Sequence, residues 1–194
     1  IMNIKGVNLV VGAKEKFNLV DQILDNYYNN KVVVDSIENT INFIPTYSLG
    51  ERTRSFLKVQ DGCDYNCSFC TIPLARGISR SGSVSDILDT TNKIYRYGIK
   101  EVVLTGVNLG DFKSNKDSLL DLIRTLNDKS MIRRFRISSI EPNLLSDEII
   151  DFISSSETFL PHFHMPLQSG SNKVLRMMKR RYDKELYLDR LNKI

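Results

Sequence analysis

Three cysteines in one short loop constrain this chain more than any other feature. Cys63, Cys67 and Cys70 are its only cysteines, and they form a CxxxCxxC pattern. Thiolates are soft ligands that favour iron–sulfur clusters, zinc or copper. A structural zinc site has four protein ligands, whereas this loop supplies three, and His162 and His164 are remote in sequence. Three cysteines on a [4Fe–4S] cluster leave one iron open to an exogenous ligand, so the pattern predicts a metal site with a chemical role.

The same cysteines have simpler interpretations. Buried cysteine often behaves as a small hydrophobic side chain, but Asp64, Asn66 and Ser68 make this an unusually polar stretch. A disulfide framework is disfavoured because the number of cysteines is odd. We therefore expect metal ligation.

Composition sets the broad class of the protein. Of its 194 residues, 41% are hydrophobic and 26% are charged, which is ordinary for a globular protein. No apolar run approaches the ~20 residues of a membrane helix, and the first residues lack the pattern of a signal peptide. We expect a cytoplasmic protein without membrane association, in a compartment whose reducing conditions suit an iron–sulfur site.

Basic residues gather in two places. One group is Arg133, Arg134 and Arg136. The second group lies near the C-terminus and consists of Lys173, Arg176, Lys179, Arg180, Arg181 and Lys184. Such clusters are consistent with RNA phosphate binding, although a solvated helix face is the commoner meaning of a charge run.

The first part of the chain resembles the end of an α/β domain. An apolar strand is expected over 7–11, an amphipathic helix over 14–28 and a second strand over 32–34. One βαβ unit is too small for an independent core, so we assign residues 1–48 to the last part of a separate α/β domain. The polar segment 36–53, with its Pro and Gly, is predicted to be an irregular linker.

After residue 53 strands and helices alternate four times. Strands are expected over 56–60, 102–104, 135–139 and 163–165, and helices near 85–97, 119–126, 145–153 and from Asn172 onward. Ser83 or Ser85 is expected to cap the first of these helices, and Gly98 to end it. This alternation predicts a parallel sheet with right-handed crossovers, in the form of a truncated partial (β/α) barrel over residues 49–194.

The distinctive polar residues follow the strands. The cysteine loop comes after the first strand, 106–108 after the second, Glu141 after the third and Gln168 after the fourth. Because the carboxyl ends of parallel strands meet at one rim, these residues are expected to share a site. His162 and His164 alternate on the last strand, and we expect them to be hydrogen-bonded residues of the barrel interior, not ligands.

At this point the sequence resembles a known family. The CxxxCxΦC pattern, with Phe69 before the last cysteine, resembles the signature of radical S-adenosylmethionine (SAM) enzymes. Five further words resemble the tRNA methylthiotransferases, which place a methylthio group on a hypermodified adenosine beside the anticodon. These words are LKVQDG at 57–62, IPLARG at 72–77, LTGVN at 104–108, SSIEP at 138–142 and HMPLQSGS at 164–171.

The resemblance assigns roles to individual residues. It implies that Cys63, Cys67 and Cys70 hold a [4Fe–4S] cluster whose fourth iron is chelated by SAM. The SAM contacts that it implies are Phe69, Gly106, Asn108, Ser138, Glu141 and Gln168.

Several of these residues have simpler interpretations. Phe69 is equally suited to be a core aromatic residue, and Gly106 to be an ordinary turn after a strand. Glu141 before Pro142 is also a favourable helix-start residue. Arg76 either neutralises charge on the cluster or SAM, or binds a loop carbonyl.

The resemblance also implies a reaction and its partners. The implied partners are SAM, tRNA and an electron donor such as flavodoxin or ferredoxin. Reductive cleavage of SAM yields a radical that takes hydrogen from carbon 2 of the adenine, sulfur comes by way of a second [4Fe–4S] cluster, and another SAM supplies the methyl group. The second cluster needs three cysteines in the N-terminal domain, and none precedes Cys63. We therefore expect it only in the full-length protein, together with a C-terminal RNA-binding domain.

The segment ARGISR at 75–80 favours one branch of the family. Its one-residue gap between Arg-Gly and Ser-Arg resembles the enzymes that act on N6-threonylcarbamoyladenosine at tRNA position 37. Three alternatives remain open: action on isopentenyladenosine tRNA, action on a ribosomal protein, and a non-catalytic metal-stapled RNA-binding module.

Overall fold

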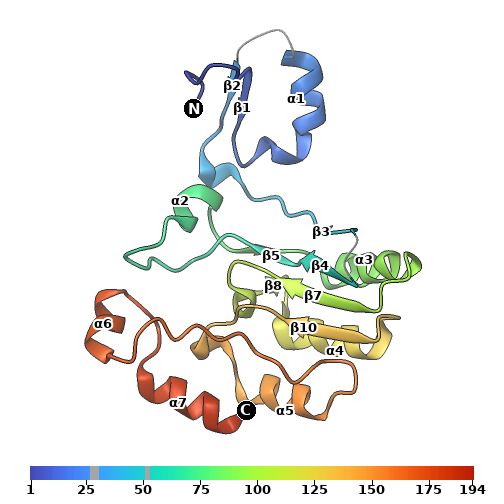
Figure 1. Cartoon of the computed structure of the whole chain (residues 1–194), viewed down its shortest axis with the longest axis vertical. Helices are drawn as coiled ribbons and strands as arrows, with labels where there is room; N and C mark the ends of the chain where they lie inside the picture. Colours follow the sequence, from blue (N-terminus) through green and yellow to red (C-terminus); the bar gives the residue numbers. More distant parts are fainter. Residues whose placement is uncertain (27–30, 51–52) are drawn as a thin grey trace.

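The N-terminal part is a small βαβ unit. The computed structural model describes residues 1–26, 31–50 and 53–194. Strands β1 (Leu9–Val11) and β2 (Lys31–Val33) are parallel. A 3-10 turn, η1 (Glu15–Asn18), and helix α1 (Leu19–Asn26) lie between them, at one end of the molecule (Figure 1). The predicted βαβ unit is confirmed, and the last two residues of the expected helix lie outside the described residues.

A parallel sheet forms the centre of the protein. Its strands β4 (Arg54–Lys58), β7 (Glu101–Thr105) and β10 (Arg134–Ile137) are parallel, in the order β10-β7-β4. Leu57 pairs with Leu104, and Leu104 pairs with Ile137. The three strands therefore end at the same level, which brings the loops that follow them to one rim.

The predicted linker contributes to this sheet. Residues Thr46–Tyr47 form β3, which pairs antiparallel with Lys58 and Leu57 of β4. A short 3-10 turn, η2 (Ile37–Asn39), precedes it. The expectation of an irregular segment was therefore wrong around β3, where two residues cover the backbone groups of an exposed sheet edge.

Three amphipathic helices follow the strands, and serine side chains cap their first turns. They are α3 (Val84–Arg96), α4 (Leu119–Lys129) and α5 (Asp147–Ser155). The hydroxyl of Ser83, not Ser85, accepts a hydrogen bond from the backbone of Asp86 and begins α3. Glycine at position 98, with φ of 80°, follows its end as predicted.

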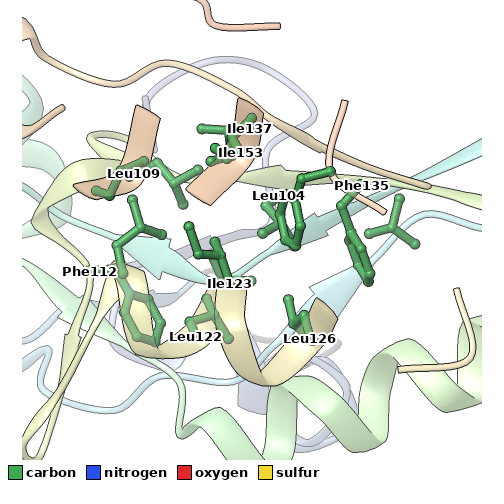
Figure 2. Packing of buried hydrophobic residues seen from close by; sticks show 14 of the residues in the cluster. Leu104, Leu109, Phe112, Leu122, Ile123, Leu126, Phe135, Ile137 and Ile153 are labelled. Carbon is green, nitrogen blue, oxygen red and sulfur yellow. The ribbon is translucent and has the colours of Figure 1, made fainter. Parts of the chain in front are cut away.

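The hydrophobic core lies between the sheet and these helices (Figure 2). Leu122, Ile123 and Leu126 of α4 are fully buried and point toward the strands. Leu104 of β7 and Phe135 of β10 meet them from the sheet. Because both faces of a parallel sheet need cover, this packing fixes the sheet and thereby the rim that carries the site.

The fourth predicted strand is not a regular strand. Residues 159–165 run beside β10 and the residues that follow it, but they make only isolated parallel bridges, Phe135 with Phe159 and Ser139 with His164. Pro161 lies between the two bridges and has no backbone N–H to donate. A tight turn, in which the backbone N–H of His162 bonds the carbonyl of Leu160, interrupts the pairing further.

The basic helix predicted from Asn172 is divided into two helices. Helix α6 (Asn172–Met177) ends where Lys179 adopts a left-handed conformation with φ of 56°, and the backbone N–H of Arg180 bonds the carbonyl of Leu175. Helix α7 (Lys184–Lys193) then starts at its N-cap, Asp183. This left-handed termination is a common helix ending, and it leaves 178–182 as a connecting segment.

Short elements complete the chain. They are β5 (Gln60–Asp61) paired with β6 (Arg80–Ser81), α2 (Ile72–Arg76), η3 (Leu109–Asp111), the hairpin of β8 (Lys113–Ser114) and β9 (Asp117–Ser118), and η4 (Pro142–Leu144). Among the helices described here, none has the length and apolar character needed to span a membrane. The α/β class and the parallel sheet are confirmed, whereas the division at residue 48 stays a prediction.

Candidate active site

A cavity of ≈ 380 Å³ opens at the carboxyl ends of the parallel strands. We call it the cysteine cavity. It is lined by Cys63, Tyr65, Cys67, Phe69, Cys70, Ile72, Val107, Asn108, Ser139, Glu141, His164, Pro166, Gln168 and Arg180. The loops after all three strands and after the irregular fourth segment contribute to it, so the predicted convergence at one rim is observed.

Backbone contacts hold the cysteine loop in place. Gly62 has φ of 73°, and a Cβ there would lie 1.9 Å from the carbonyl oxygen of Ile78. A side chain is therefore excluded at this position. The backbone N–H of Cys63 donates to the carbonyl of Gly77, and that of Cys70 donates to the carbonyl of Cys67.

The three thiols differ in exposure. Cys67 is buried, Cys63 and Cys70 are half-buried, and none is in a disulfide. Burial raises the pKa of the Cys63 thiol. Within the described residues no three His, Cys, Asp or Glu side chains converge closely enough to hold one metal ion. A [4Fe–4S] cluster does not need that convergence, because each thiolate binds its own iron.

Arg180 is a site residue that the sequence analysis assigned to the surface. Its side chain is only 4% exposed. One guanidinium nitrogen lies 3.2 Å from Cys67 Sγ, and another forms an ion pair with Glu141. Burial lowers the pKa of Arg180, but the hydrogen bond with Glu141 and the charge of Glu141 together raise it, so the cation is retained.

The rest of segment 178–182 also contacts the cysteine loop. The backbone N–H of Ser68 donates to the carbonyl of Met178. The guanidinium of Arg181 donates to the carbonyl of Asp64 and lies 3.9 Å from the centroid of the Tyr65 ring. Both interpretations of the basic cluster, phosphate binding and a solvated helix face, placed these residues at the surface, and for Arg180 both were wrong because it is buried against the cysteines.

The predicted SAM contacts separate into two groups. Phe69, Asn108, Glu141 and Gln168 line the cysteine cavity, whereas Gly106 and Ser138 do not. Side chains alternate along an extended segment, and here Ser139, not Ser138, faces the cavity. Its hydroxyl lies 2.7 Å from Nδ1 of His164, so His164 is hydrogen-bonded as expected. His162 and His164 are both exposed, contrary to the expected interior position.

Asn108 has the strongest signal of an open ligand site. It is 3% exposed, yet neither side-chain polar atom has a hydrogen-bond partner among the described residues. Its backbone N–H is fixed by Gln60 Oε1 at 3.0 Å. A buried amide without partners is unfavourable, and one that lines a cavity is suited to bind a polar ligand there.

Gly106 has a different local reason for lacking a side chain. A Cβ on Gly106 would lie 2.7 Å from Oε1 of Gln60. The Gln60 amide in turn donates to the carbonyl of Gly62 at 2.8 Å, next to the first cysteine. The close approach at Gly106 therefore accommodates Gln60, which connects the cysteine loop to Asn108.

Two other predicted roles change. Arg76 donates to Asp61 at 3.1 Å and is 49% exposed, so it binds a carboxylate and not a loop carbonyl. Arg134 and Arg136 pair with Glu101 at the amino ends of the strands. That arginine group lies at the rim opposite the cysteines.

The burial pattern fits a cluster-and-nucleoside site. The thiols lie at one cavity, an orphaned amide and the Glu141–Arg180 pair offer both polarities, and Phe69 is 54% exposed there. An exposed aromatic ring beside a cavity is available for stacking on a base. The residues that line the cavity therefore fit both an iron–sulfur cluster and a bound nucleoside such as that of SAM.

Curated relatives resemble the whole chain. It is 36% identical over 204 residues to a "Threonylcarbamoyladenosine tRNA methylthiotransferase MtaB" of Bacillus subtilis, which aligns with 100% of this chain and 45% of the relative. The corresponding Aquifex aeolicus protein is 38% identical, over 99% of this chain and 48% of the relative. A "tRNA-2-methylthio-N(6)-dimethylallyladenosine synthase" of Orientia tsutsugamushi is 32% identical, over 94% and 43%. The chain thus spans about half the length of these proteins.

A solved structure shares the fold. The radical S-adenosylmethionine methyltransferase TsrM of Kitasatospora setae superposes with a TM-score of 0.59 at 14% identity, over 72% of this chain and 28% of that one. Residues 57–194 match the family described as the Radical SAM superfamily. With its parallel sheet and its cysteine cavity at the carboxyl ends of the strands, the chain belongs to the radical SAM superfamily.

Proposed function

We propose that this chain is the SAM-cleaving part of a tRNA methylthiotransferase that acts on N6-threonylcarbamoyladenosine at position 37. The observation that supports this most directly is the convergence of Cys63, Cys67 and Cys70 on a cavity with polar groups from every following loop. Relatives named for this substrate match over the whole chain.

Cys63, Cys67 and Cys70 would hold a [4Fe–4S] cluster. When bound, such a cluster supplies the one-electron reduction that cleaves SAM into methionine and a 5′-deoxyadenosyl radical. The electron comes from a one-electron donor of the flavodoxin or ferredoxin class. Arg180 keeps a positive charge beside Cys67, which offsets the negative charge of the thiolates.

The remaining cavity residues would bind SAM and exclude water. Asn108 offers an amide donor and acceptor without other partners among the described residues. Phe69 offers an exposed ring, and Glu141 a buried carboxylate fixed by Arg180. Gln168 has φ of 62°, a conformation that is uncommon for residues other than glycine and that is found at ligand sites.

The competing candidate function is a methylthiotransferase that acts on dimethylallyladenosine in tRNA. A relative named as a dimethylallyladenosine synthase is 32% identical, so the family match alone does not separate the two substrates. To identify the substrate, the full-length protein is incubated with tRNA that carries one or the other modified adenosine. The tRNA is then digested and examined by mass spectrometry for the methylthio group.

Replacement of each cysteine tests the cluster assignment. We expect Cys63→Ala, Cys67→Ala and Cys70→Ala each to prevent anaerobic reconstitution of about four irons per chain. No other thiol is present in the sequence to replace the missing ligand. Iron analysis, electron paramagnetic resonance and 5′-deoxyadenosine formation provide the readout.

The outcome of reconstitution separates catalysis from a structural metal. Tightly bound zinc without iron, or 5′-deoxyadenosine formation by all three variants, would contradict the proposal. A Ser68→Ala variant serves as the matched control, because Ser68 lies in the same loop and contributes its backbone N–H, which alanine keeps.

A further inference from the structure

A second cavity lies beside the cysteine cavity. It has a volume of ≈ 400 Å³ and is lined by Lys58, Gln60, Ile72, Arg76, Thr105, Gly106 and Val107. Ile72 and Val107 also line the cysteine cavity, so the two spaces share a wall. We call the second space the Lys58–Arg76 cavity. None of its polar side chains is a candidate cluster ligand.

The charge at this cavity is strongly unbalanced. Asp61 is 1% exposed and pairs with Lys16 at 2.9 Å, Lys58 at 3.4 Å, Arg76 at 3.1 Å and Arg80 at 3.2 Å. Four cations on one carboxylate leave an excess of three positive charges in this network. Burial lowers the pKa of Lys58, and the charges of Lys16 and Arg80 lower it further against the opposing effect of Asp61.

Lys58, one of the cations that line the cavity, is held in position by two aromatic rings and by Asp61. The ammonium of Lys58 lies 5.4 Å from the ring centroid of Phe17 and 5.5 Å from that of Phe43. Among the described residues its hydrogen bond goes to Asp61 alone, although an ammonium has three donors. Phe17 belongs to the N-terminal βαβ unit, so this unit helps to orient the charge.

Only two of the four cations face the cavity. Lys58 and Arg76 line it, with side chains that are 22% and 49% exposed. Arg80 is buried and donates to the carbonyls of Arg76 and Ile78. Lys16 does not line the cavity, which makes it a matched charge on the same carboxylate but outside the space.

We propose that the Lys58–Arg76 cavity binds the carboxylate of the threonylcarbamoyl group while the adenine lies at the mouth of the cysteine cavity, next to the bound SAM. This inference rests on the proposed function and names the part of the molecule that selects the substrate. The N6 substituent of threonylcarbamoyladenosine carries a carboxylate and a hydroxyl, whereas that of isopentenyladenosine is a hydrocarbon. An excess of positive charge in a partly buried cavity stabilises the first and gives no matching partner to the second.

Binding of nucleosides to the chain tests the proposal directly. The probes are N6-threonylcarbamoyladenosine, its carboxyl methyl ester and N6-isopentenyladenosine, titrated calorimetrically into the reconstituted protein with SAM present. We expect the free acid to bind roughly tenfold or more tightly than the ester, because the ester has lost the negative charge that strengthens hydrogen bonds to Lys58 and Arg76. Equal affinity for acid and ester would overturn the proposal.

Substitutions then locate the preference. Lys58→Met and Arg76→Gln should each remove most of the preference for the acid, whereas Lys16→Gln should retain it. Lys58→Arg keeps the positive charge and should also retain the preference for the acid. This variant and the thermal unfolding of each variant control for loss of folding. An unchanged preference in both Lys58→Met and Arg76→Gln would contradict the assignment.

An RNA phosphate is the other source of an anion. If the cavity bound a backbone phosphate, Lys58→Met and Arg76→Gln would weaken the binding of an unmodified anticodon stem-loop as much as the binding of one with threonylcarbamoyladenosine. That result would overturn the proposal. Iron content and SAM cleavage are measured on the same preparations. A protein that assembles its cluster and cleaves SAM but shows no acid preference refutes this inference alone, whereas failure of both reactions refutes the proposed function.

Discussion

Arg180 connects three chemically different groups at the cysteine cavity. Its guanidinium contacts Cys67 Sγ and the Glu141 carboxylate, and it lies 6.0 Å from the Phe69 ring centroid and 5.1 Å from that of Tyr182. Burial raises the pKa of Glu141, and the ion pair with Arg180 partly offsets that effect. The ion pair therefore helps Glu141 to remain charged, whereas the guanidinium of Arg180 stays charged on its own.

Loss of Arg180 should destabilise the fold through Glu141. We expect Arg180→Met to lower the free energy of unfolding by about 3–5 kcal/mol near neutral pH, because a buried carboxylate loses its only counter-charge in this pair. Urea denaturation measures the change. Lys179→Ala, a change of the exposed neighbouring cation, should leave the free energy of unfolding almost unaltered.

The loss of unfolding free energy in Arg180→Met should depend on pH, and this dependence identifies its cause. Without Arg180, burial raises the folded-state pKa of Glu141 above its unfolded value of about 4.3. The neutral acid is then tolerated at low pH, and stability is lost as the pH rises through the raised pKa. The deficit should thus shrink toward pH values near 4, and adding Glu141→Gln should recover part of it at neutral pH. A deficit that is independent of pH would argue against this explanation.

At the scale of elements, the break between α6 and α7 decides which basic residues face solvent. The left-handed residue Lys179 ends the helix and turns segment 178–182 onto the cysteine loop. Lys173, Arg176 and Lys179 remain exposed. Arg181 and Lys184 are exposed as well, so Arg180 is the member of this cluster that the fold withdraws from phosphate.

The exposed residues give a revised test for RNA binding. The triple change Lys173→Ala, Arg176→Ala and Lys179→Ala should weaken tRNA binding and reduce the slope of log K against log salt by roughly one unit for each phosphate that the protein no longer binds. Filter binding over a range of salt concentrations measures the slope. The arginine group at the opposite rim provides the control, because Arg133→Ala should leave the salt slope unchanged. A slope that stays the same in the triple variant would identify a solvated helix face.

At the scale of the whole molecule, the βαβ unit and the barrel meet at Asp61. Lys16 donates to Asp61, and the guanidinium Nε of Arg80 donates to the carbonyl of Asn42. The junction thus lies immediately before the cysteine loop. Any ligand that enters the Lys58–Arg76 cavity contacts residues whose positions depend on both parts.

The 194-residue chain should separate the two half-reactions of the proposed function. Its only three cysteines are those of the loop, so it has no thiolates for a second cluster. With SAM, reductant and threonylcarbamoyladenosine-containing tRNA we expect slow formation of 5′-deoxyadenosine and no methylthiolated base. Liquid chromatography with mass spectrometry of the digested tRNA decides this. A methylthio adduct would show that sulfur reaches the base without an auxiliary cluster.

Local signals in the sequence determined much of the fold. The apolar run around Val103 specified a buried parallel strand, and Ser83 and Gly98 specified the ends of α3. The cysteine spacing specified the loop that holds the candidate ligands. Each of these rests on neighbouring residues, which is why the sequence is sufficient to predict them.

Tertiary contacts decided the rest. Pro161 lies just before the predicted strand at 163–165, which forms only an isolated bridge, and Lys179 ended a helix without the glycine that normally marks such a break. Arg180 resembles a surface cation in the sequence because its partners, Cys67 and Glu141, are 113 and 39 residues away. Charge patterns along a chain do not show which cation is buried. The burial of a charge depends on a partner that only the folded chain brings to it, and for that physical reason the sequence located the site while the structure determined its electrostatics.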